Sequence, residues 1–541
     1  MKWWGKYAKI SIEIRDNSIP KQWLLEPDSL PSKEQRTVLS VPTDSGALTP
    51  AEIEMTESDV EQLLEAYRSR KWTVRQVVTA FLKKAVIMNQ LTNFVTEFLS
   101  DEALQRADEL DAHLESTGSL AGPLHGIPTS VKEHLGLANR ITNAGFVSFI
   151  TQPPPTEDAL LVRLLRQSGA VIHLRTNQPQ SLMHLDCENN ITGRTLNPHN
   201  LLLSPGGSSG GEGVGVGSGC AVLGVGTDIG GSIRIPAAFG GCYGFRPTAL
   251  RVPTRGTVGL TAGQESIRGV VGPLARSVEG LQAWMKAVLD QEPWEVDTTL
   301  APVPWRSGVG LGDFTVGVLW DDGIVKPHPP VLRALRTAVD RLKAAGVKVV
   351  DWEPYEHQRG WEIIAPLYFP DGGQRYLDEF AKTGEPALPL TLHAFDFAKK
   401  SGKMPLSVHD NWALNAEREN YRREHHALMK ERGVDFILCP AYVGAGVLQG
   451  GAKYWQYTSI WNILDLPSVV LPSGLRCDKD VDVPDENYKP RSAIDEEEWR
   501  AYDPELFDGF PIALQLAGKR FQDEEMLAFT KVLDNAIRVD K

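Results

Sequence analysis

The sequence predicts an α/β fold in which a mixed, mostly parallel and twisted sheet is covered by helices on both faces. Short apolar segments of strand length alternate repeatedly with amphipathic segments of helical length, which is typical of such sheets. The chain has 541 residues, of which 42% are hydrophobic and 23% are charged. This length and composition allow one large core, so we expect a single large α/β unit.

The expected elements follow one another in a consistent order. Thr56–Asp59 has a capping-box pattern at the start of a helix, and Thr73 with Gln76 opens the next one. Helices are predicted at 74–88, 102–114, 158–167, 330–345, 417–431 and 523–537, and strands at 126–133, 170–174, 314–320, 347–350, 435–439, 466–472 and 511–516. Gly346 stands at the C′ position of its helix.

Two segments are expected to lie outside this core pattern. Residues 1–55 are predicted to form a helical N-terminal extension that packs on the main domain, 56–541, through Trp3, Trp4 and Trp23. The segment 476–508 has twelve Asp and Glu residues against five Lys and Arg. We expect it to be an exposed acidic insertion and not a cluster of catalytic carboxylates.

The charge and the composition exclude several classes of partner. The net charge is −13 and no basic run is long enough for a nucleic-acid site, so no such partner is expected. No stretch approaches 18 apolar residues and the first ten residues have no apolar signal region, so we expect neither a membrane segment nor secretion. Five scattered cysteines without a C-x-x-C motif favour reduced thiols and a cytoplasmic protein.

The histidines show no spacing typical of a metal site. We therefore expect no metal, and no cofactor of another kind. His425 and His426 are adjacent in a charged helical segment, and we interpret both as surface residues.

A glycine-rich segment, Ser204–Pro236, is the most informative part of the chain. Eight of the fourteen residues from Gly206 to Gly219 are glycine, and the segment contains Ser208, Ser209 and Ser232. It has no lysine for a phosphate-binding loop, and its glycines do not fit G-x-G-x-x-G. The apolar residues in its second half argue against a flexible linker. The remaining interpretation is a group of backbone N–H groups that face a developing oxyanion, with serine hydroxyls as the reacting groups.

The sequence contains two other candidate nucleophiles. Gly206–Gly210 matches G-x-S-x-G formally, but Pro205 precedes it where an α/β-hydrolase requires a strand, and no later histidine lies in an obvious catalytic loop. Asp186–Cys187 could indicate a cysteine nucleophile, but no other residue supports it. Ser218, Cys220 and Cys242 are interpreted as structural residues.

These motifs resemble the amidase signature family. The family's defining blocks are G-G-S-S-G-G-E-G and G-T-D-I-G-G-S-I-R-x-P, and Gly206–Gly213 and Gly226–Pro236 reproduce both. Gly126–Glu133 resembles the family's lysine segment, and the resemblance extends from about residue 55 to the C-terminus. Within the family, the chain is most similar to fungal acetamidases and general amidases, and its core motifs also resemble fatty acid amide hydrolase.

The resemblance implies a role for each matching residue. Ser232 would be the acyl-forming nucleophile, Ser208 a bridging serine on a cis peptide, and Lys132 the base. The backbone N–H groups of Ile229, Gly230, Gly231 and Ser232 would bind the oxyanion, and Leu182, with Ser208, would border the substrate. Ser209 and Thr227 would form secondary hydrogen bonds to the Lys–Ser pair, and Asp228 and Arg234 would hold the nucleophile loop.

The physics of a lysine base agrees with this assignment. A hydroxyl can accept and donate at once, so Ser208 can pass a proton between Ser232 and Lys132. Lysine must be neutral to act as a base, and burial lowers its pKa. The apolar neighbours Ile127, Val131 and Ile229 therefore favour the role of Lys132.

The expected function is hydrolysis of a small carboxylic acid amide to the acid and ammonia or an amine. We expect a hydrolase of linear amide C–N bonds that acts on a small-molecule substrate, and the resemblance suggests a homodimer. The first alternative is a lipid amidase similar to fatty acid amide hydrolase, whose mammalian form has an N-terminal membrane anchor that is not seen here. The others are the amidase subunit of a tRNA-dependent amidotransferase and a binding protein without catalysis. The three catalytic candidates are all present, which argues against the last.

Overall fold

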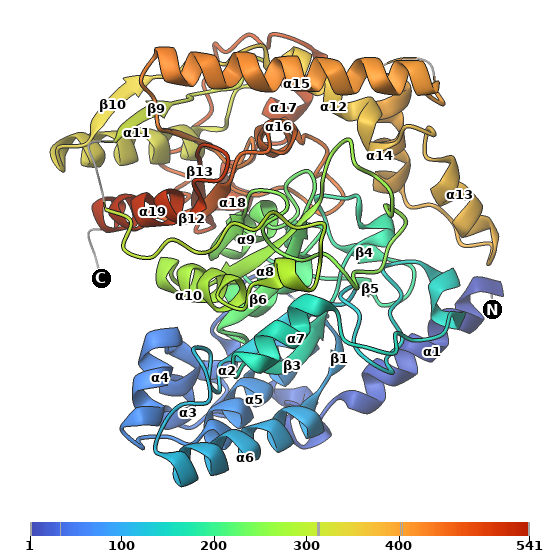
Figure 1. Cartoon of the computed structure of the whole chain (residues 1–541), viewed down its shortest axis with the longest axis vertical. Coiled ribbons are helices and arrows are strands. Elements are labelled where there is room, and N and C mark those ends of the chain that lie inside the picture. Colours follow the sequence, from blue (N-terminus) through green and yellow to red (C-terminus); the bar gives the residue numbers. More distant parts are fainter. Residues whose placement is uncertain (1–2, 33, 311–313, 401, 403, 539–541) are drawn as a thin grey trace.

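The computed structural model describes residues 3–32, 34–310, 314–400, 402 and 404–538, and it has the predicted α/β fold. One mixed sheet forms the centre of the molecule, and helices pack on both of its faces (Figure 1). Helices α3 (Pro50–Glu57), α4 (Val60–Arg68), α5 (Val74–Thr92) and α6 (Ser100–Thr117) gather at one end of the long axis, while α15 (Val408–Glu431) crosses the opposite end.

The central sheet has eleven strands in the order β1-β3-β2-β6-β8-β7-β12-β13-β11-β9-β10. Parallel pairing joins β3, β2 and β6 near one end and β11, β9 and β10 at the other. Antiparallel pairing through β8, β7, β12 and β13 connects these two groups. The strands are β1 (Val95–Phe98), β2 (Pro128–Lys132), β3 (Val171–Thr176), β6 (Leu223–Asp228), β7 (Tyr243–Arg246), β8 (Val270–Ala275), β9 (Thr315–Val318), β10 (Lys348–Asp351), β11 (Phe436–Pro440), β12 (Ser468–Arg476) and β13 (Pro511–Ala517), and β4 (Glu188–Asn189) pairs separately with β5 (Gly193–Arg194).

The helices cover the sheet in several groups. Helices α5, α6 and α8 pack on β2 and β3 or on one of them, whereas α9, α10, α11 and α19 pack on the central and C-terminal strands. The helices are α1 (Trp3–Ser18), α2 (Val41–Asp44), α3 (Pro50–Glu57), α4 (Val60–Arg68), α5 (Val74–Thr92), α6 (Ser100–Thr117), α7 (Leu160–Gln167), α8 (Gly210–Gly217), α9 (Arg234–Gly240), α10 (Val278–Leu289), α11 (Pro329–Ala344), α12 (His357–Tyr368), α13 (Gln374–Ala381), α14 (Pro389–Lys400), α15, α16 (Gln456–Leu464), α17 (Ala493–Arg500), α18 (Pro504–Phe507) and α19 (Asp523–Ile537).

Most predicted elements are present, and most differ by a few residues at their ends, but α15 begins at Val408 and not at residue 417 as predicted. Thr73 accepts from Gln76 N in a complete capping box at the start of α5, and Gly346 has a left-handed φ of 81° after α11. The earlier cap was placed wrongly, because Thr56 lies within α3 and the capping box of α4 is formed by Asp59 and Gln62. Helix α3 also crosses the predicted boundary at residue 55.

The N-terminal region is helical and lies against the main domain. Helix α1 packs on β1, and Trp4 contacts a small buried cluster that includes Val147 and Ile150. Trp23 packs against the main core. The Trp3 side chain lies outside the described part of the chain.

The prediction of a surface position for His425 was wrong. His425 is only 1% exposed, and its ring packs near Trp352 and Trp461, with centroid distances of 5.5 and 6.3 Å. Tyr421 and Met429, one turn away on either side, are buried too, so this charged helix has one narrow apolar face. Burial lowers the pKa of His425 to about 3. His426, on the other side, is exposed.

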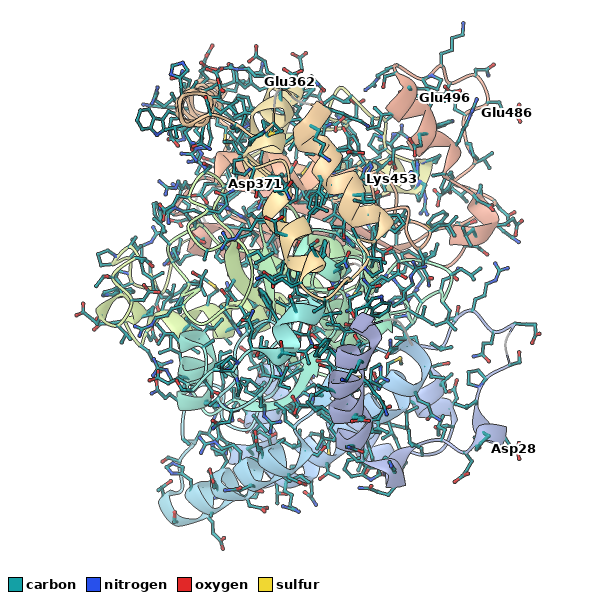
Figure 2. All side chains as sticks on the ribbon, turned by 90° about the vertical axis from the view of Figure 1, so that its right-hand side faces the viewer. Asp28, Glu362, Asp371, Lys453, Glu486 and Glu496 are labelled. Carbon is teal, nitrogen blue, oxygen red and sulfur yellow. The ribbon has the colours of Figure 1, made fainter. Side chains whose placement is uncertain are left out.

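The segment 476–508 is only partly the exposed insertion that was predicted. Figure 2 shows Glu486 and Glu496 at the outer edge of the molecule. Asp482 and Asp495, in contrast, are buried. Asp482 forms an ion pair with Arg333 at 2.7 Å, and Asp495 accepts from Lys326 N at 2.9 Å. These carboxylates attach the insertion to the main domain, which explains why they are inside.

No helix in the described ranges combines the length and apolar character that a membrane crossing requires.

Candidate active site

The three catalytic candidates come from neighbouring parts of the sheet and its helices. Lys132 is the last residue of β2, Ser208 lies just before α8, and Ser232 lies between β6 and α9. Because β2 and β6 are adjacent parallel strands, their carboxyl ends meet at one edge of the sheet. All three residues are buried.

Lys132 and Ser208 are in direct contact. Lys132 Nζ and Ser208 Oγ form a hydrogen bond of 2.6 Å, and Lys132 Nζ also donates to Thr227 Oγ1 at 3.1 Å. The Gly207–Ser208 peptide bond is cis. A Cβ on Gly207 would lie 2.1 Å from the carbonyl oxygen of Asp186, so only glycine allows the backbone to pass this close. The glycine block therefore fixes the position of Ser208.

The surroundings of Lys132 favour its neutral form. Its side chain is completely buried, and this burial lowers the pKa to about 7 from 10.5. Cys187, Asp228 and Glu212 each act in the opposite direction, as nearby groups that are negative when ionised. The desolvation effect is larger, so Lys132 loses its proton near neutral pH.

A buried carboxylate lies close to this lysine. Glu212, on α8, accepts hydrogen bonds from Ser130 Oγ at 2.7 Å, Thr176 Oγ1 at 2.6 Å and Val225 N at 3.1 Å. Burial raises the pKa of Glu212 to about 7. Glu212 thus joins α8 to the three neighbouring strands β2, β3 and β6.

Ser232 is joined to the Ser208 segment through the backbone. Ser209 N donates to the carbonyl oxygen of Ser232 at 3.1 Å. In the described part of the chain no group is within hydrogen-bonding geometry of Ser232 Oγ. Among the described residues, Ser209 Oγ hydrogen-bonds to the backbone of Thr227, at 3.2 Å from N and 3.3 Å from O, and the predicted hydrogen bond to the Lys–Ser pair is not formed.

An ion pair organises the nucleophile loop. Asp228 and Arg234 are fully buried and lie 3.0 Å apart. Asp228 accepts from Gly231 N at 2.9 Å and from Ile233 N at 3.1 Å, on either side of Ser232. The Arg234 guanidinium holds the pKa of this carboxyl well below its usual range. The pair therefore fixes the loop that presents Ser232.

Side chains of α16 and β13 complete this network. Arg234 donates to the oxygens of Asn462 at 2.6 Å, Gln515 at 2.8 Å and Thr458 (carbonyl) at 2.9 Å. Thr458 Oγ1 donates in turn to the carbonyl oxygen of Gly230 at 2.6 Å. The loop is thus held by hydrogen bonds from more than 200 residues away in the sequence.

The backbone N–H groups of the loop differ in whether they already have a hydrogen-bond acceptor. Gly231 N–H donates to Asp228, whereas the N–H groups of Ile229, Gly230 and Ser232 have no acceptor among the described residues. Gly231 has a φ of 133°, and a Cβ there would lie 2.4 Å from Thr458 Oγ1. Three of the four predicted oxyanion donors are consequently available.

Aromatic side chains cover the same loop. Tyr368 donates to the carbonyl oxygen of Ile229 at 3.0 Å, and its ring packs against Trp455 at 5.7 Å between centroids. Tyr368 also lines a cavity of about 610 Å³ together with the polar α15 residues Asn411, Asn415, Arg418 and Arg422. Tyr368 and Trp455 are both buried, and both lie beside Gly230 of the nucleophile loop.

Leu182 has an unusual backbone conformation. It ends a short 3-10 turn in which Ser181 and Leu182 both have positive φ, 66° and 62°. Such conformations cost about 1–3 kcal/mol each and cluster at functional sites. Leu182 is half-buried, and its Cδ1 would lie 3.6 Å from a Cβ on Gly259.

Sequence reasoning missed His134. This histidine is buried, and its Nε2 lies 3.0 Å from Thr227 Oγ1, the same atom that Lys132 contacts. The strand pattern could not indicate it, because β2 ends at Lys132 and Leu135 N donates to the Lys132 carbonyl oxygen at 3.0 Å, so His134 lies in a turn after the strand.

The other predicted structural residues have structural contacts. Ser218 Oγ donates to the carbonyl oxygen of Val214 at 2.6 Å. All five cysteines are buried and free, and burial raises the pKa of Cys187 to about 12, which disfavours the thiolate. Among the described residues, no three His, Cys, Asp or Glu side chains are grouped as metal ligands.

Comparison with known proteins gives the family. The Amidase family model matches residues 76–527. A Schizosaccharomyces pombe protein is 44% identical over 530 residues, which cover 97% of this chain and 98% of that protein. An acetamidase of Emericella nidulans is 37% identical over 538 residues and 96% of each chain.

A solved structure agrees with these relatives. A fatty acid amide hydrolase structure superposes with a TM-score of 0.95 and 39% identity, covering 99% of this chain and 95% of that one. The similarity includes the whole sheet and the helices around it. The chain described here belongs to the amidase family of enzymes.

Proposed function

We propose that the enzyme hydrolyses a carboxylic acid amide through an acyl-enzyme on Ser232, with Ser208 as the bridging hydroxyl and Lys132 as the base. The observation that carries this proposal is the 2.6 Å contact between Lys132 Nζ and Ser208 Oγ in a buried site. A neutral amine beside a hydroxyl is the arrangement that serine activation requires.

The acylation step moves two protons and forms one bond. The Lys132 lone pair takes the proton of Ser208, Ser208 takes the proton of Ser232, and Ser232 Oγ bonds to the amide carbon. The proton on Lys132 then returns through Ser208 to the leaving nitrogen as the C–N bond breaks. Apo geometry of catalytic hydrogen bonds is often loose, so the Ser208–Ser232 contact is expected to close with substrate bound.

We propose that the N–H groups of Ile229, Gly230 and Ser232 stabilise the tetrahedral oxyanion. Gly231 N–H is better assigned to the loop, because Asp228 accepts from it at 2.9 Å. Loss of one such donor costs about 10²–10³ in rate in other hydrolases. Leu182 is proposed to border the substrate beside this group.

Deacylation reverses the same steps with water as the nucleophile. Lys132, acting through Ser208, takes one proton from water while the oxygen bonds to the acyl carbon. The proton returns to Ser232 Oγ as the ester bond breaks, which releases the carboxylic acid. The free enzyme is thereby restored without any added cofactor.

We propose a small amide as the substrate, in agreement with the acetamidase relative. A second candidate is a long-chain lipid amide, which the fatty acid amide hydrolase structure favours. The test measures ammonia or amine release by the purified chain from acetamide, benzamide and a long-chain amide. Preference for the long-chain amide would select the second candidate, and activity only with partner proteins would favour an amidotransferase subunit.

The cellular setting is also a proposal. Five buried free thiols agree with a reducing compartment, and we propose the cytoplasm. Homodimerisation stays a prediction that the mass of the protein in solution tests.

A further inference from the structure

His134 belongs to a chain of hydrogen bonds that ends at the proposed base. Its Nδ1 lies 3.1 Å from the carbonyl oxygen of Val258, and its Nε2 lies 3.0 Å from Thr227 Oγ1. Thr227 Oγ1 lies 3.1 Å from Lys132 Nζ. The backbone N of His134 also donates to Gln178 Oε1 at 3.1 Å, so both the backbone and the ring of His134 are fixed by hydrogen bonds.

The direction of each hydrogen bond in this chain follows from one carbonyl group. A carbonyl oxygen can only accept, so His134 Nδ1 carries a hydrogen and donates to Val258. Burial and the nearby Lys132 lower the pKa of His134 to about 3, so the ring is neutral and Nε2 has a free lone pair. The Thr227 hydroxyl must then donate to Nε2, and its oxygen is left to accept from Lys132.

This direction decides how Lys132 is oriented. A neutral amine has two N–H bonds and one lone pair in tetrahedral arrangement. Because Thr227 can only accept from it, one N–H of Lys132 points to Thr227. The lone pair is then free for the other neighbour, the hydroxyl of Ser208, 2.6 Å away.

We propose that His134 is a positioning residue which, through Thr227, keeps the lone pair of Lys132 directed at Ser208. Without His134, the Thr227 hydroxyl can rotate and donate its hydrogen to Lys132. The lone pair would then be occupied by Thr227 and would not accept the proton of Ser208. The inference rests on the proposed function of Lys132 as the base, and it adds a residue that touches neither substrate nor reacting atoms.

Few titratable groups surround this series of hydrogen bonds, and the direction in which each shifts the pKa of Lys132 is defined. Asp228, Glu212 and Cys187 face Lys132 from β6, α8 and the segment before β4, and each favours its charged form when ionised. His134 and Lys132 each disfavour a positive charge on the other. Replacing the neutral His134 with an apolar side chain therefore leaves the charges around Lys132 unchanged.

The test is a double-variant cycle on kcat/KM at alkaline pH, where Lys132 is neutral. H134L is expected to lose about tenfold, the effect of one misdirected hydrogen bond. T227V should lose less, because no hydroxyl is left to occupy the lone pair. H134L/T227V should therefore be several-fold more active than H134L alone. H134Q, whose Oε1 can accept from Thr227, should retain most activity.

Three results would overturn the proposal: wild-type activity in H134L, a double variant no more active than H134L, or a pH midpoint that rises in H134L. The midpoint of the pH profile distinguishes a change in the orientation of Lys132 from general disruption of the site. In H134L it should not rise, whereas a loosened site would admit water and raise it toward 10.5, which also contradicts the proposal. H134M replaces H134L if that variant does not fold, and H425L controls for loss of a buried histidine.

The same experiment distinguishes this inference from failure of the proposed function. S232A and K132A are assayed beside the His134 variants on the same amide. If either retains wild-type activity, the proposed function fails whatever His134 does. If both are inactive while H134L and wild type are equal, only the present inference fails.

Discussion

Lys132 Nζ and Ser208 Oγ lie 2.6 Å apart, and both residues are at least 98% buried. Removal of water has two effects at this contact. It lowers the pKa of Lys132 to about 7, and it strengthens the hydrogen bond through which the proton moves. The pair is therefore suited to act as a base near neutral pH.

Removal of the three proposed catalytic side chains should have graded effects. S232A is expected to abolish amide hydrolysis with an unchanged fold, because no carbon–oxygen bond can form. K132A should lose several orders of magnitude, above the ~10²–10⁴ that a general base supplies alone. S208A should be intermediate or similar. The measurement is kcat/KM on benzamide, with circular dichroism to verify folding.

S218A is the matched control for these serine variants. Ser218 is buried in the same glycine-rich segment, but its hydroxyl donates to the carbonyl oxygen of Val214. We expect activity within a few-fold of wild type. Retained hydrolysis in S232A, or loss in S218A equal to that in S208A, would assign the chemistry to other residues.

Lys132 should make stability depend on pH in a defined direction. Its pKa is about 7 when folded and ordinarily 10.5, so the unfolded chain binds more protons between these values. Stability contributed by this group therefore rises with pH across that window, by up to ~1.4 kcal/mol per unit, and is lost as pH falls to 7. K132M lacks this dependence.

Comparison of the two melting curves measures this effect. At pH 7, K132M should melt at a higher temperature than wild type, because methionine needs no deprotonation to be buried. The difference should shrink as the pH rises to 9. A difference that is constant or grows with pH would mean that Lys132 is charged in the folded protein.

The Asp228–Arg234 ion pair should be essential as a pair. Both side chains are 0% exposed, so either D228N or R234M leaves a buried polar group without its partner. Each is expected to cost about 3–5 kcal/mol of stability. The double variant should be more stable than either single variant but remain inactive, because Gly231 and Ile233 lose the carboxylate.

Arg251 and Asp523 form the matched control pair. They lie 3.2 Å apart and are equally buried, but Asp523 is the first residue of α19 and, in the described part of the chain, neither residue hydrogen-bonds to the nucleophile loop. R251M/D523N should show a stability change without loss of kcat. An active D228N/R234M variant would show that the first pair serves stability alone.

Gly230 should tolerate no side chain. A Cβ there would lie 2.9 Å from Tyr368 Oη and 3.2 Å from Trp455, so G230A must displace the loop. Misplacement by about 1 Å can cost ~10²-fold in rate, and we expect a loss of that order in kcat/KM. G230A/Y368F should recover part of it, since the nearest atom is removed.

G259A is the control for the glycine substitution. Its nearest neighbour, Leu182 Cδ1, would be 3.6 Å from the new Cβ, which is an ordinary contact. Its activity should stay close to that of wild type. Equal losses in G230A and G259A, or no recovery in G230A/Y368F, would contradict the close packing of Tyr368 on the loop.

The fold could be predicted where local pattern and final structure agree. The helix–strand alternation around β2, β3, β9 and β11 gave correct elements, because each strand is fully buried between helices. The antiparallel strands β7 and β8 were not predicted. They are short, and β8 contains Gly272 and Pro273 within its six residues, which weakens any strand pattern.

The burial of polar side chains could not be predicted from local pattern. Asp482 looks like a surface residue in an acidic segment until Arg333, about 150 residues earlier, lies beside it. His425 is buried only because Trp352 and Trp461 form a pocket for it. In both cases the partner is distant in sequence, so composition indicated the wrong environment.

The site follows the same rule. Lys132, Ser208 and Ser232 are in motifs long enough to be located in the sequence. The use of Gly231 N–H by Asp228, the Tyr368–Ile229 contact and the His134–Thr227 contact depend on the packing of separate segments. A motif names the reacting groups but not the residues that orient them.

The most direct test of the central claim labels the nucleophile and follows the rate of labelling with pH. The protein is incubated with a serine-directed sulfonyl fluoride, and the modified peptide is identified by mass spectrometry. The account predicts modification of Ser232, at a rate that rises with pH through a midpoint near 7 as Lys132 loses its proton. Modification of another residue, or a rate that is flat from about pH 6 to about pH 10, would contradict it.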